Sequence, residues 1–148
     1  MDVLVDTNVL VRRLNRRDPQ YRDARAALKT LSQRGDKVCI VAQNIIELWS
    51  VCTRPTDRNG FGLSTAVADR VTERIEASFQ FLPETHAIYT AWREIVVHHA
   101  VSGLKVHDAR LVAAAVAHGV KSILTFNGAD FRRYAQIEVL DPSSVAVR

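Results

Sequence analysis

The chain opens with Val3-Leu4-Val5-Asp6-Thr7-Asn8, three apolar residues followed at once by a carboxylate and two polar side chains. Such a compact apolar run predicts a short buried strand. Asp6 then stands at the carboxyl end of that strand, which is where open α/β sheets bind their ligands. Apart from capping the next helix, a carboxylate has little structural purpose there. We therefore take Asp6 as the first candidate site residue.

Strand and helix patterns alternate along the rest of the chain, which predicts one α/β domain over residues 1–148 with a parallel sheet and right-handed crossovers. We expect strands at residues 3–5, 38–41, 79–82, 122–125 and 137–140. We expect helices at about residues 8–15, 19–34, 43–53, 65–77, 86–99 and 108–118, and a turn or short helix at 129–134. Residues 54–63 and 100–107 are expected to be connections.

Small polar residues mark the starts of these helices, because their side chains accept hydrogen bonds from the first free backbone amides. The expected caps are Thr7 or Asn8, Asp18 followed by Pro19, Ser64, Thr85 and Asp108.

The composition is that of an ordinary globular protein, with 47% hydrophobic and 24% charged residues in a chain of 148. No apolar run approaches the roughly 20 residues that cross a bilayer. The first residues also lack a signal-peptide pattern, so we expect a cytoplasmic protein that does not bind membranes. Cys39 and Cys52 have no metal-binding or redox spacing and are expected to be reduced packing residues.

The net charge of +4 is largely due to arginine. The arginines cluster at Arg12, Arg13, Arg16 and Arg17 and at Arg132 and Arg133. The planar guanidinium fork suits phosphate, although solvated helix faces explain such clusters as well. The charge favours a nucleic-acid partner without establishing one.

Three more acidic residues occur at places that suit the same site as Asp6. Glu47 lies in an apolar helix, Asp108 at a helix start and Asp130 just after an apolar strand. Carboxylates gathered at one edge of a sheet cannot all stay ionised without a cation. The simplest explanation is a divalent metal site, and on a basic chain that indicates phosphodiester chemistry on nucleic acid.

Each of these acids also has an ordinary structural explanation. A solvated helix surface explains Glu47, a helix cap explains Asp108, and a turn before a short helix explains Asp130. Asn127, near the same strand end, offers an amide oxygen as a further ligand. The hypothesis of one site rests on the acids occurring together, all at strand or helix ends compatible with one edge of the sheet.

The opening residues 3–10 resemble those of PIN-domain ribonucleases, especially the VapC-type toxins of bacterial toxin–antitoxin pairs. The order of the acids is similar too, with Glu47 in the third helix, Asp108 in His107-Asp108-Ala109-Arg110-Leu111, and Asp130 in Thr125-Phe126-Asn127-Gly128-Ala129-Asp130-Phe131. The resemblance covers nearly the whole chain. Glu47-Leu48-Trp49, Thr53-Arg54-Pro55 and Asn59-Gly60 also resemble one branch of the family, and we assign no chemical role to the loop they include.

The resemblance implies a three-layer α/β/α sandwich around a parallel sheet of four to five strands, a Mg²⁺ or Mn²⁺ cofactor, and endonucleolytic cleavage of RNA. It assigns Asp6, Glu47 and Asp108 as catalytic carboxylates and metal ligands. The fourth position is open between Asn127, where many relatives have aspartate, and Asp130, a variant also found in the family. Residues in supporting roles would be Thr7, Asn8, Thr125, Asn127 and Arg110, the last of which a surface ion pair explains equally well.

Oxygen ligands of this kind favour Mg²⁺ or Mn²⁺ over zinc. An ion there would activate water for in-line attack on phosphorus and stabilise the leaving oxygen, so we expect products with 5′-phosphate and 3′-hydroxyl ends. The resemblance further implies a homodimer and a small antitoxin protein as partner, one segment of which covers the acidic site.

Other classes of function stay open. One is an RNA-binding or regulatory PIN-like module that has weakened metal binding at Asn127 and no nuclease activity. Another is a phosphoryl-transfer domain of the haloacid dehalogenase or receiver type, although the former usually has a second aspartate where this chain has Asn8. A dinucleotide-binding domain is disfavoured, because the first strand lacks a glycine-rich turn.

Overall fold

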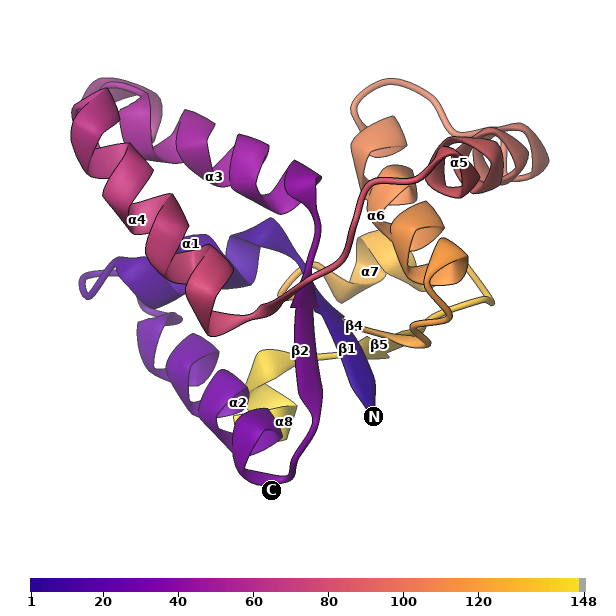
Figure 1. Ribbon diagram of the computed structural model, residues 1–148, viewed down its shortest axis with the longest axis horizontal. Helices are drawn as coiled ribbons and strands as arrows, with labels where there is room; N and C mark the ends of the chain where they lie inside the picture. The colour runs from indigo at the N-terminus through magenta and orange to yellow at the C-terminus, as the bar shows by residue number, and fades with distance from the viewer. Residues whose placement is uncertain (147–148) are drawn as a thin grey trace.

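The computed structural model describes residues 1–146, in which strands and helices alternate as the sequence predicts (Figure 1). The strands are β1 (Asp2–Val5), β2 (Lys37–Ile40), β3 (Gln80–Phe81), β4 (Ser122–Leu124) and β5 (Glu138–Leu140). The helices are α1 (Thr7–Leu14), α2 (Tyr21–Gln33), α3 (Ala42–Thr53), α4 (Thr65–Ser78), α5 (His86–His98), α6 (Lys105–Ala117), α7 (Gly128–Phe131) and α8 (Pro142–Ala146).

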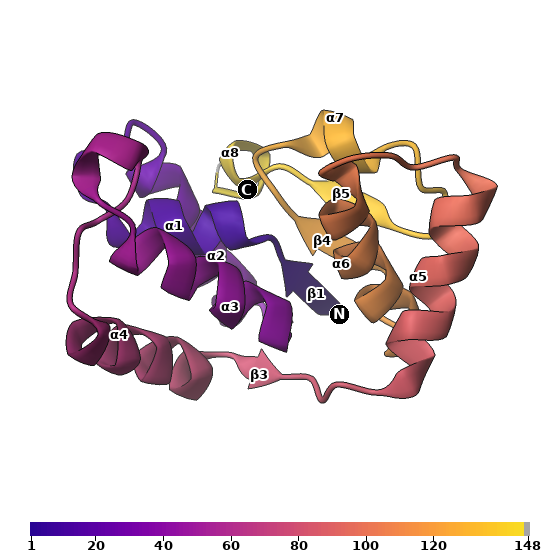
Figure 2. The same ribbon diagram turned by 90° about the horizontal axis from the view of Figure 1, so that it is seen from above.

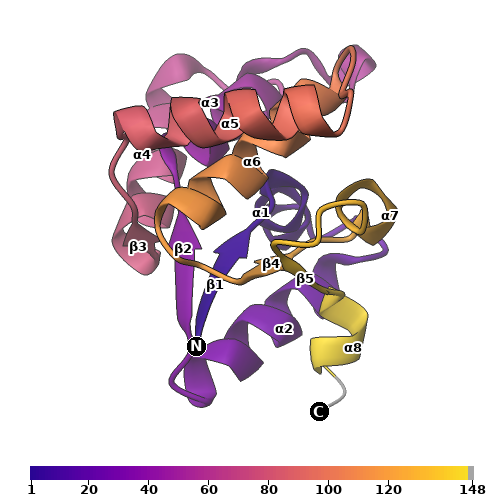
Figure 3. The ribbon, with the colours of Figure 1, turned by 90° about the vertical axis from the view of Figure 1, so that its right-hand side faces the viewer.

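The five strands form one parallel sheet in the order β3-β2-β1-β4-β5. Figure 3 shows β1 and β2 as arrows that point the same way. Leu4 of β1 lies opposite Cys39 of β2 on one side and Ile123 of β4 on the other. The chain adds β2 and β3 on one side of β1 and then crosses to add β4 and β5 on the other. The strand order therefore reverses between β1 and β4, and the carboxyl ends of such a pair form a ligand-binding crevice.

Helices cover both faces of the sheet and enclose two separate hydrophobic cores. Successive side chains of a strand point to opposite faces, so β1 contributes to both cores. Val3 and Val5 pack with α1, α2, α3, α4 and α8, whereas Leu4 packs with α5 and α6. Figure 2 shows α1 to α4 on one side of the sheet and α5 and α6 on the other. The expected three-layer α/β/α sandwich is confirmed.

Two helices near the candidate site begin at other residues than the sequence predicts. Helix α1 begins at Thr7, so Asp6 rather than Thr7 or Asn8 occupies the cap position, and the Asp6 carboxylate makes no capping hydrogen bond. Helix α6 begins at Lys105, so Asp108 lies in its first turn and does not cap it. The structure therefore removes helix capping as the explanation of Asp108. Asp6 remains at a cap position, and the Asn8 amide lowers its pKa, although no regular capping hydrogen bond forms.

The other expected helix starts hold to within a few residues. Ser64 caps α4 as expected. Thr85 occupies the cap position of α5 but makes no side-chain hydrogen bond. Helix α2 begins at Tyr21 instead of Pro19, because Asp18 closes a turn of its own before the helix.

Three features of the described chain lie outside the sequence prediction. Residues Thr56–Arg58 form a 3₁₀ helix within the expected loop 54–63, and α8 follows the last strand. Gly103 adopts a φ of 61°, and this turn lets α6 begin inside the expected connection 100–107. Between residues 1 and 146, no helix has the length and apolar character needed to cross a membrane.

Candidate functional site

A pocket of about 400 Å³ lies at the carboxyl ends of β1 and β4, among residues of α1, α3 and α6. We call it the acidic pocket. Its polar and charged lining residues are Asp6, Thr7, Asn8, Arg12, Glu47, Ser50, Arg54, Asp108 and Asn127. Three of the four predicted acids thus line one pocket. A larger pocket of about 590 Å³ lies between α2 and the end of α4, but none of its lining residues is acidic, and it is not a candidate metal site.

Asp6 is the most deeply placed acid of the pocket, with only 7% of its surface exposed. Burial raises the pKa of Asp6 from 3.8 to about 6. A hydrogen bond from Thr125 opposes this rise, and the charges of Asp108 and Glu47 add to it. The three acids therefore interact electrostatically, and a cation among them would relieve both the burial and the repulsion.

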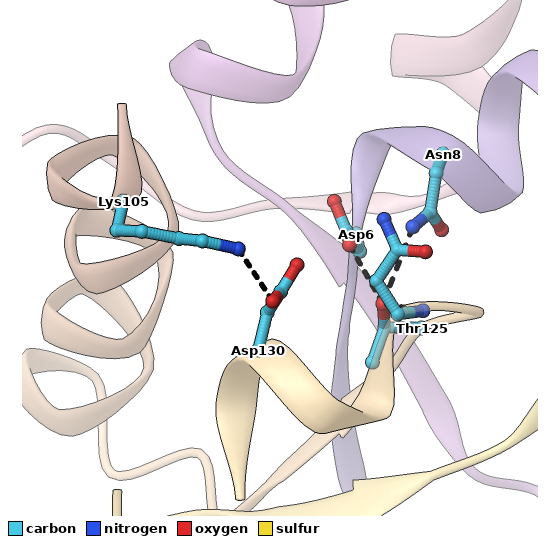
Figure 4. A network of polar contacts seen from close by, with 6 residues as sticks. Asp6, Asn8, Lys105, Thr125 and Asp130 are labelled. Atoms are coloured by element: carbon cyan, nitrogen blue, oxygen red, sulfur yellow. Dashed lines mark hydrogen bonds and ion pairs between the residues drawn. The ribbon is translucent and has the colours of Figure 1, made fainter. Parts of the chain in front are cut away.

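Thr125 fixes the orientation of the Asp6 carboxylate. Its hydroxyl donates to Asp6 Oδ2 over 2.7 Å and accepts from Asn8 Nδ2 at 3.3 Å and from the backbone amide of Asn127 at 3.0 Å. A hydroxyl has one proton to donate and two lone pairs, so these three bonds use it fully. Figure 4 shows Asp6, Asn8 and Thr125 gathered where β1 and β4 end. The predicted supporting residues Asn8 and Thr125 thus both act on the position of Asp6.

Gln43 holds Glu47 within the acidic pocket. Its Nε2 donates to Glu47 Oε1 over 2.6 Å and to the backbone carbonyl of His107 over 2.8 Å. Because His107 directly precedes Asp108 in α6, Gln43 fixes the Glu47 side chain relative to the Asp108 backbone. Gln43 is itself only 7% exposed, and both bonds are partly buried.

Asn44, the next residue in α3, ties this helix to the end of β1. Its Oδ1 accepts from the Val41 amide at 2.8 Å, and its Nδ2 donates to the Val5 carbonyl at 3.0 Å and to Thr7 Oγ1 at 3.1 Å. Sequence reasoning missed Gln43 and Asn44. The available signal was two adjacent amides at the start of a helix otherwise rich in core-facing apolar residues, since buried polar side chains require partners.

Asp108 enters the acidic pocket from the first turn of α6 and is partly buried. Burial raises the pKa of Asp108, and the charges of Asp130 and Glu47 add to the effect, while Lys105 opposes it. The Asp108 carboxylate is therefore close enough to both Glu47 and Asp130 for their charges to disfavour its ionised form.

Asp130, the fourth predicted acid, does not line the acidic pocket. Its Oδ1 forms an ion pair with Lys105 Nζ over 2.5 Å, and Figure 4 shows the two side chains directed toward one another from α7 and α6. Asn127 occupies the pocket wall instead. The predicted supporting residue Arg110 is also outside the pocket, where it forms an ion pair with Glu84 over 2.8 Å.

The donor set of the pocket fits a hard divalent cation. Carboxylate, hydroxyl and amide oxygens are the ligands that Mg²⁺ and Mn²⁺ prefer. Within residues 1–146, no three acidic, histidine or cysteine side chains are grouped closely enough to ligate one ion directly. Mg²⁺ commonly binds through one or two carboxylates and keeps several waters, so acids spread around a pocket suit it.

Comparison with known protein families shows which family the chain belongs to. The model of the PIN domain family matches residues 3–137, which is most of the chain. The chain belongs to the PIN-domain family. A comparison with curated protein sequences gives no match.

Several solved structures share the PIN fold seen here. A chain of VapBC2 from Rickettsia felis, bound to a DNA fragment of its promoter, matches with a TM-score of 0.70 and 14% identity over 95% of this chain and 98% of that chain. A chain of FitAcB from Neisseria gonorrhoeae matches with a TM-score of 0.68 and 21% identity, over 96% of this chain and 98% of that chain. VapC20 from Mycobacterium tuberculosis matches with a TM-score of 0.62 and 18% identity, over 89% of this chain and 95% of that chain. VapC20 is described as a toxin that cleaves the sarcin–ricin loop. At these identities the likeness is one of fold.

Proposed function

We propose that this PIN-domain protein is a Mg²⁺- or Mn²⁺-dependent endoribonuclease and the toxin of a toxin–antitoxin pair. The observation that carries the proposal is the convergence of Asp6, Glu47 and Asp108 on one pocket where the strand order reverses. Burying acids together is unfavourable unless a cation is bound. The fold shared with VapC20, a toxin that cleaves the sarcin–ricin loop, supports RNA as the substrate.

The residues of the pocket have distinct roles in this proposal. Asp6, Glu47 and Asp108 would hold the divalent ion, partly through waters that the ion retains, because the three carboxylates are not grouped closely enough to ligate it together. The ion would supply an activated water and neutralise charge on the phosphate oxygens. Thr125 keeps one Asp6 oxygen engaged and leaves the other free for the ion. Gln43 does the same for Glu47 through Oε1. Attack by water does not require the ribose 2′-hydroxyl, so no cyclic phosphate forms. With the 3′-oxygen as the leaving group, the new P–O bond to water replaces the bond to that oxygen, and the products carry 5′-phosphate and 3′-hydroxyl ends.

The decisive experiment is incubation of a mixed RNA pool with the purified protein in Mg²⁺, Mn²⁺ or EDTA, beside Asp6→Asn. We expect cleavage with either metal, none in EDTA, and none by the variant. Sequencing of the cut ends should find 5′-phosphates. Cleavage that persists in EDTA, or products with a 2′,3′-cyclic phosphate, would contradict a metal-dependent hydrolysis.

As a toxin, the protein would have two protein partners, an antitoxin and a second copy of its own chain. The similar VapBC structures belong to toxin–antitoxin systems, and by analogy an antitoxin segment would cover the acidic pocket, with an arginine paired to its carboxylates. The chain is also expected to form a homodimer. Light scattering at micromolar concentration tests this, and a monomer there rejects it.

An RNA-binding or regulatory module without nuclease activity is the second candidate function. The amide of Asn127 in the pocket wall favours it, because an amide holds a cation more weakly than a carboxylate. The same experiment separates the two functions when RNA binding by both proteins is measured as well. A module of this kind would bind RNA equally well with and without Asp6→Asn, and it would not cut RNA in either metal.

A further inference from the structure

Two arginines line the acidic pocket, and neither is paired with an acid. The Arg12 guanidinium donates to the Asn8 carbonyl over 3.2 Å and to the Gln20 side chain, and it lies 5.3 Å from the centre of the Phe126 ring. Arg54 Nη2 donates to a backbone carbonyl. Within the described residues, the ion pairs of the chain involve neither arginine. Both positive charges therefore remain available beside the carboxylates.

Arg54 belongs to a closed loop at the end of α3, residues 54–62, which we call the Arg54 loop. The Arg54 amide ends the helix by donating to the Ser50 carbonyl over 2.9 Å, and Pro55 prevents the helix from continuing. The loop then returns to the same residue, because the Gly62 amide donates to the Arg54 carbonyl over 2.8 Å. Arg54 Nη2 in turn donates to the Asn59 carbonyl over 3.3 Å. Arg54 is thus the point at which the loop begins and closes.

Gly60 is required by this closure. A Cβ atom at Gly60 would lie 2.0 Å from the Arg54 carbonyl oxygen, a contact that only glycine avoids. Asn59 adopts a φ of 59°, a conformation that asparagine tolerates better than most residues. The sequence motif Thr53-Arg54-Pro55 with Asn59-Gly60 therefore has a structural purpose. It builds a tight loop that holds Arg54 at the acidic pocket.

We propose that Arg54, together with Arg12, binds a backbone phosphate of RNA beside the bond to be cleaved. This inference rests on the proposed ribonuclease function. A pocket with three carboxylates repels a polyanion, so an RNA strand needs cationic contacts next to the site as well as a metal within it. An arginine bound only to neutral groups keeps its full charge, and its planar fork matches phosphate.

The Arg54 loop also explains how such a contact gains affinity. A flexible surface arginine loses side-chain entropy when it binds, whereas one already held by its own loop loses less. The hydrogen bond to Asn59 uses one of five guanidinium donors and leaves the others for phosphate.

The test measures RNA binding in the Asp6→Asn background, which removes cleavage from the measurement. The probe is a fluorescein-labelled single-stranded RNA of mixed sequence, titrated in Mg²⁺ at several salt concentrations. We compare Arg54→Ala with Arg58→Ala, because Arg58 is an exposed arginine of the same loop that does not line the acidic pocket. We expect Arg54→Ala to weaken binding about 10-fold and to lower the salt slope by about 1, and Arg58→Ala to change neither.

A second variant tests the loop separately from the charge. Gly60→Ala retains Arg54 but forces a clash with its carbonyl, so we expect it to weaken RNA binding like Arg54→Ala in a protein whose circular dichroism shows an intact fold. Binding by Gly60→Ala as tight as that of the parent would overturn the role of the loop.

The outcomes separate this inference from the proposed function. If the wild-type protein cleaves RNA but Arg54→Ala and Arg58→Ala bind RNA alike, the phosphate contact is wrong and the nuclease stands. If the wild-type protein does not cleave RNA but Arg54→Ala alone loses affinity, the contact of Arg54 with the RNA backbone stands, whereas the nuclease and the place of that contact beside a cleaved bond are wrong.

Discussion

Thr125 Oγ1 donates a hydrogen bond to Asp6 Oδ2 over 2.7 Å and joins two residues that are 119 positions apart in the chain. The bond connects the ends of β4 and β1, the pair of strands at which the sheet order reverses. It stabilises the carboxylate form of a side chain whose burial favours the protonated acid. The opposition of these two effects leaves the pKa of Asp6 at about 6, which makes its charge sensitive to pH and to any bound cation.

We predict that Asp6→Asn stabilises the metal-free protein at about pH 8. The pKa of Asp6 is higher in the folded protein, about 6, than its ordinary value of 3.8, so folding favours the protonated acid. Protonated Asp6 therefore contributes to the stability of the folded protein fully below about pH 4, and this contribution is lost as the pH rises through 6. Above that window the ionised acid costs about 3 kcal/mol, which asparagine avoids.

Urea unfolding in EDTA measures this effect. The free energy of unfolding of Asp6→Asn should exceed that of the wild type near pH 8 and match it near pH 4. The matched control is Asp57→Asn, because Asp57 is an exposed acid outside the pocket. Equal stability of Asp6→Asn and wild type at both pH values would contradict the raised pKa of Asp6.

We also predict that metal binding releases protons near pH 6. A divalent cation requires ionised ligands, and Asp6 is half protonated at that pH in the absence of metal. Calorimetric titration with Mn²⁺ in two buffers of different ionisation enthalpy should therefore give different apparent heats near pH 6 and similar heats near pH 8. Affinity should rise with pH over the same interval. A buffer-independent heat near pH 6 would show that Asp6 does not ligate the ion.

Thr125→Val should raise the pKa of Asp6 above its wild-type value, because the bond from Thr125 lowers that pKa. The substitution also leaves Asn8 Nδ2 and the Asn127 amide without their acceptor, which we expect to cost about 1–3 kcal/mol of stability. Carboxyl titration by NMR measures the pKa, and Thr125→Ser is the control that keeps the hydroxyl. An unchanged pKa in Thr125→Val would show that the bond is not formed in solution.

The sequence predicts the location of Asp6 well because a local pattern determines it. An apolar run must be buried, and the residue that follows it must lie at the end of the strand. The same local logic places Ser64 at the start of α4. The parallel sheet follows from the alternation of strands and helices, whereas the strand order comes only from the structure.

The sequence does not predict which side chains meet across the pocket. Gln43 contacts His107 only because the first turns of α3 and α6, helices on opposite faces, meet at the carboxyl edge of the sheet. Asn44 likewise reaches Val5 across 39 residues. Asp108 resembles a cap in the sequence, but the turn at Gly103 starts α6 earlier and frees it. These are long-range consequences of packing, which local patterns do not contain.

The last prediction concerns the fourth position of the site, which the sequence leaves open between Asn127 and Asp130. Asn127 lines the acidic pocket, whereas Asp130 lies outside it in an ion pair with Lys105. If the proposed ribonuclease uses the geometry seen here, Asn127→Ala removes a pocket oxygen and Asp130→Asn does not. We therefore expect Asn127→Ala to reduce the cleavage rate about 10-fold or more and Asp130→Asn to change it by less than about 3-fold.

The variant Lys105→Met tests whether the ion pair with Lys105 keeps Asp130 away from the metal. It removes the partner of the ion pair and leaves Asp130 free to approach Asp108, whose pKa the Asp130 charge already raises. If Asp130 becomes a ligand when it is released, Lys105→Met should tighten Mn²⁺ binding, and Asp130→Asn should abolish that gain in the double variant. A large loss of cleavage in Asp130→Asn with full activity in Asn127→Ala would instead assign the fourth position to Asp130. That result would require α7 to move toward the acidic pocket when metal binds.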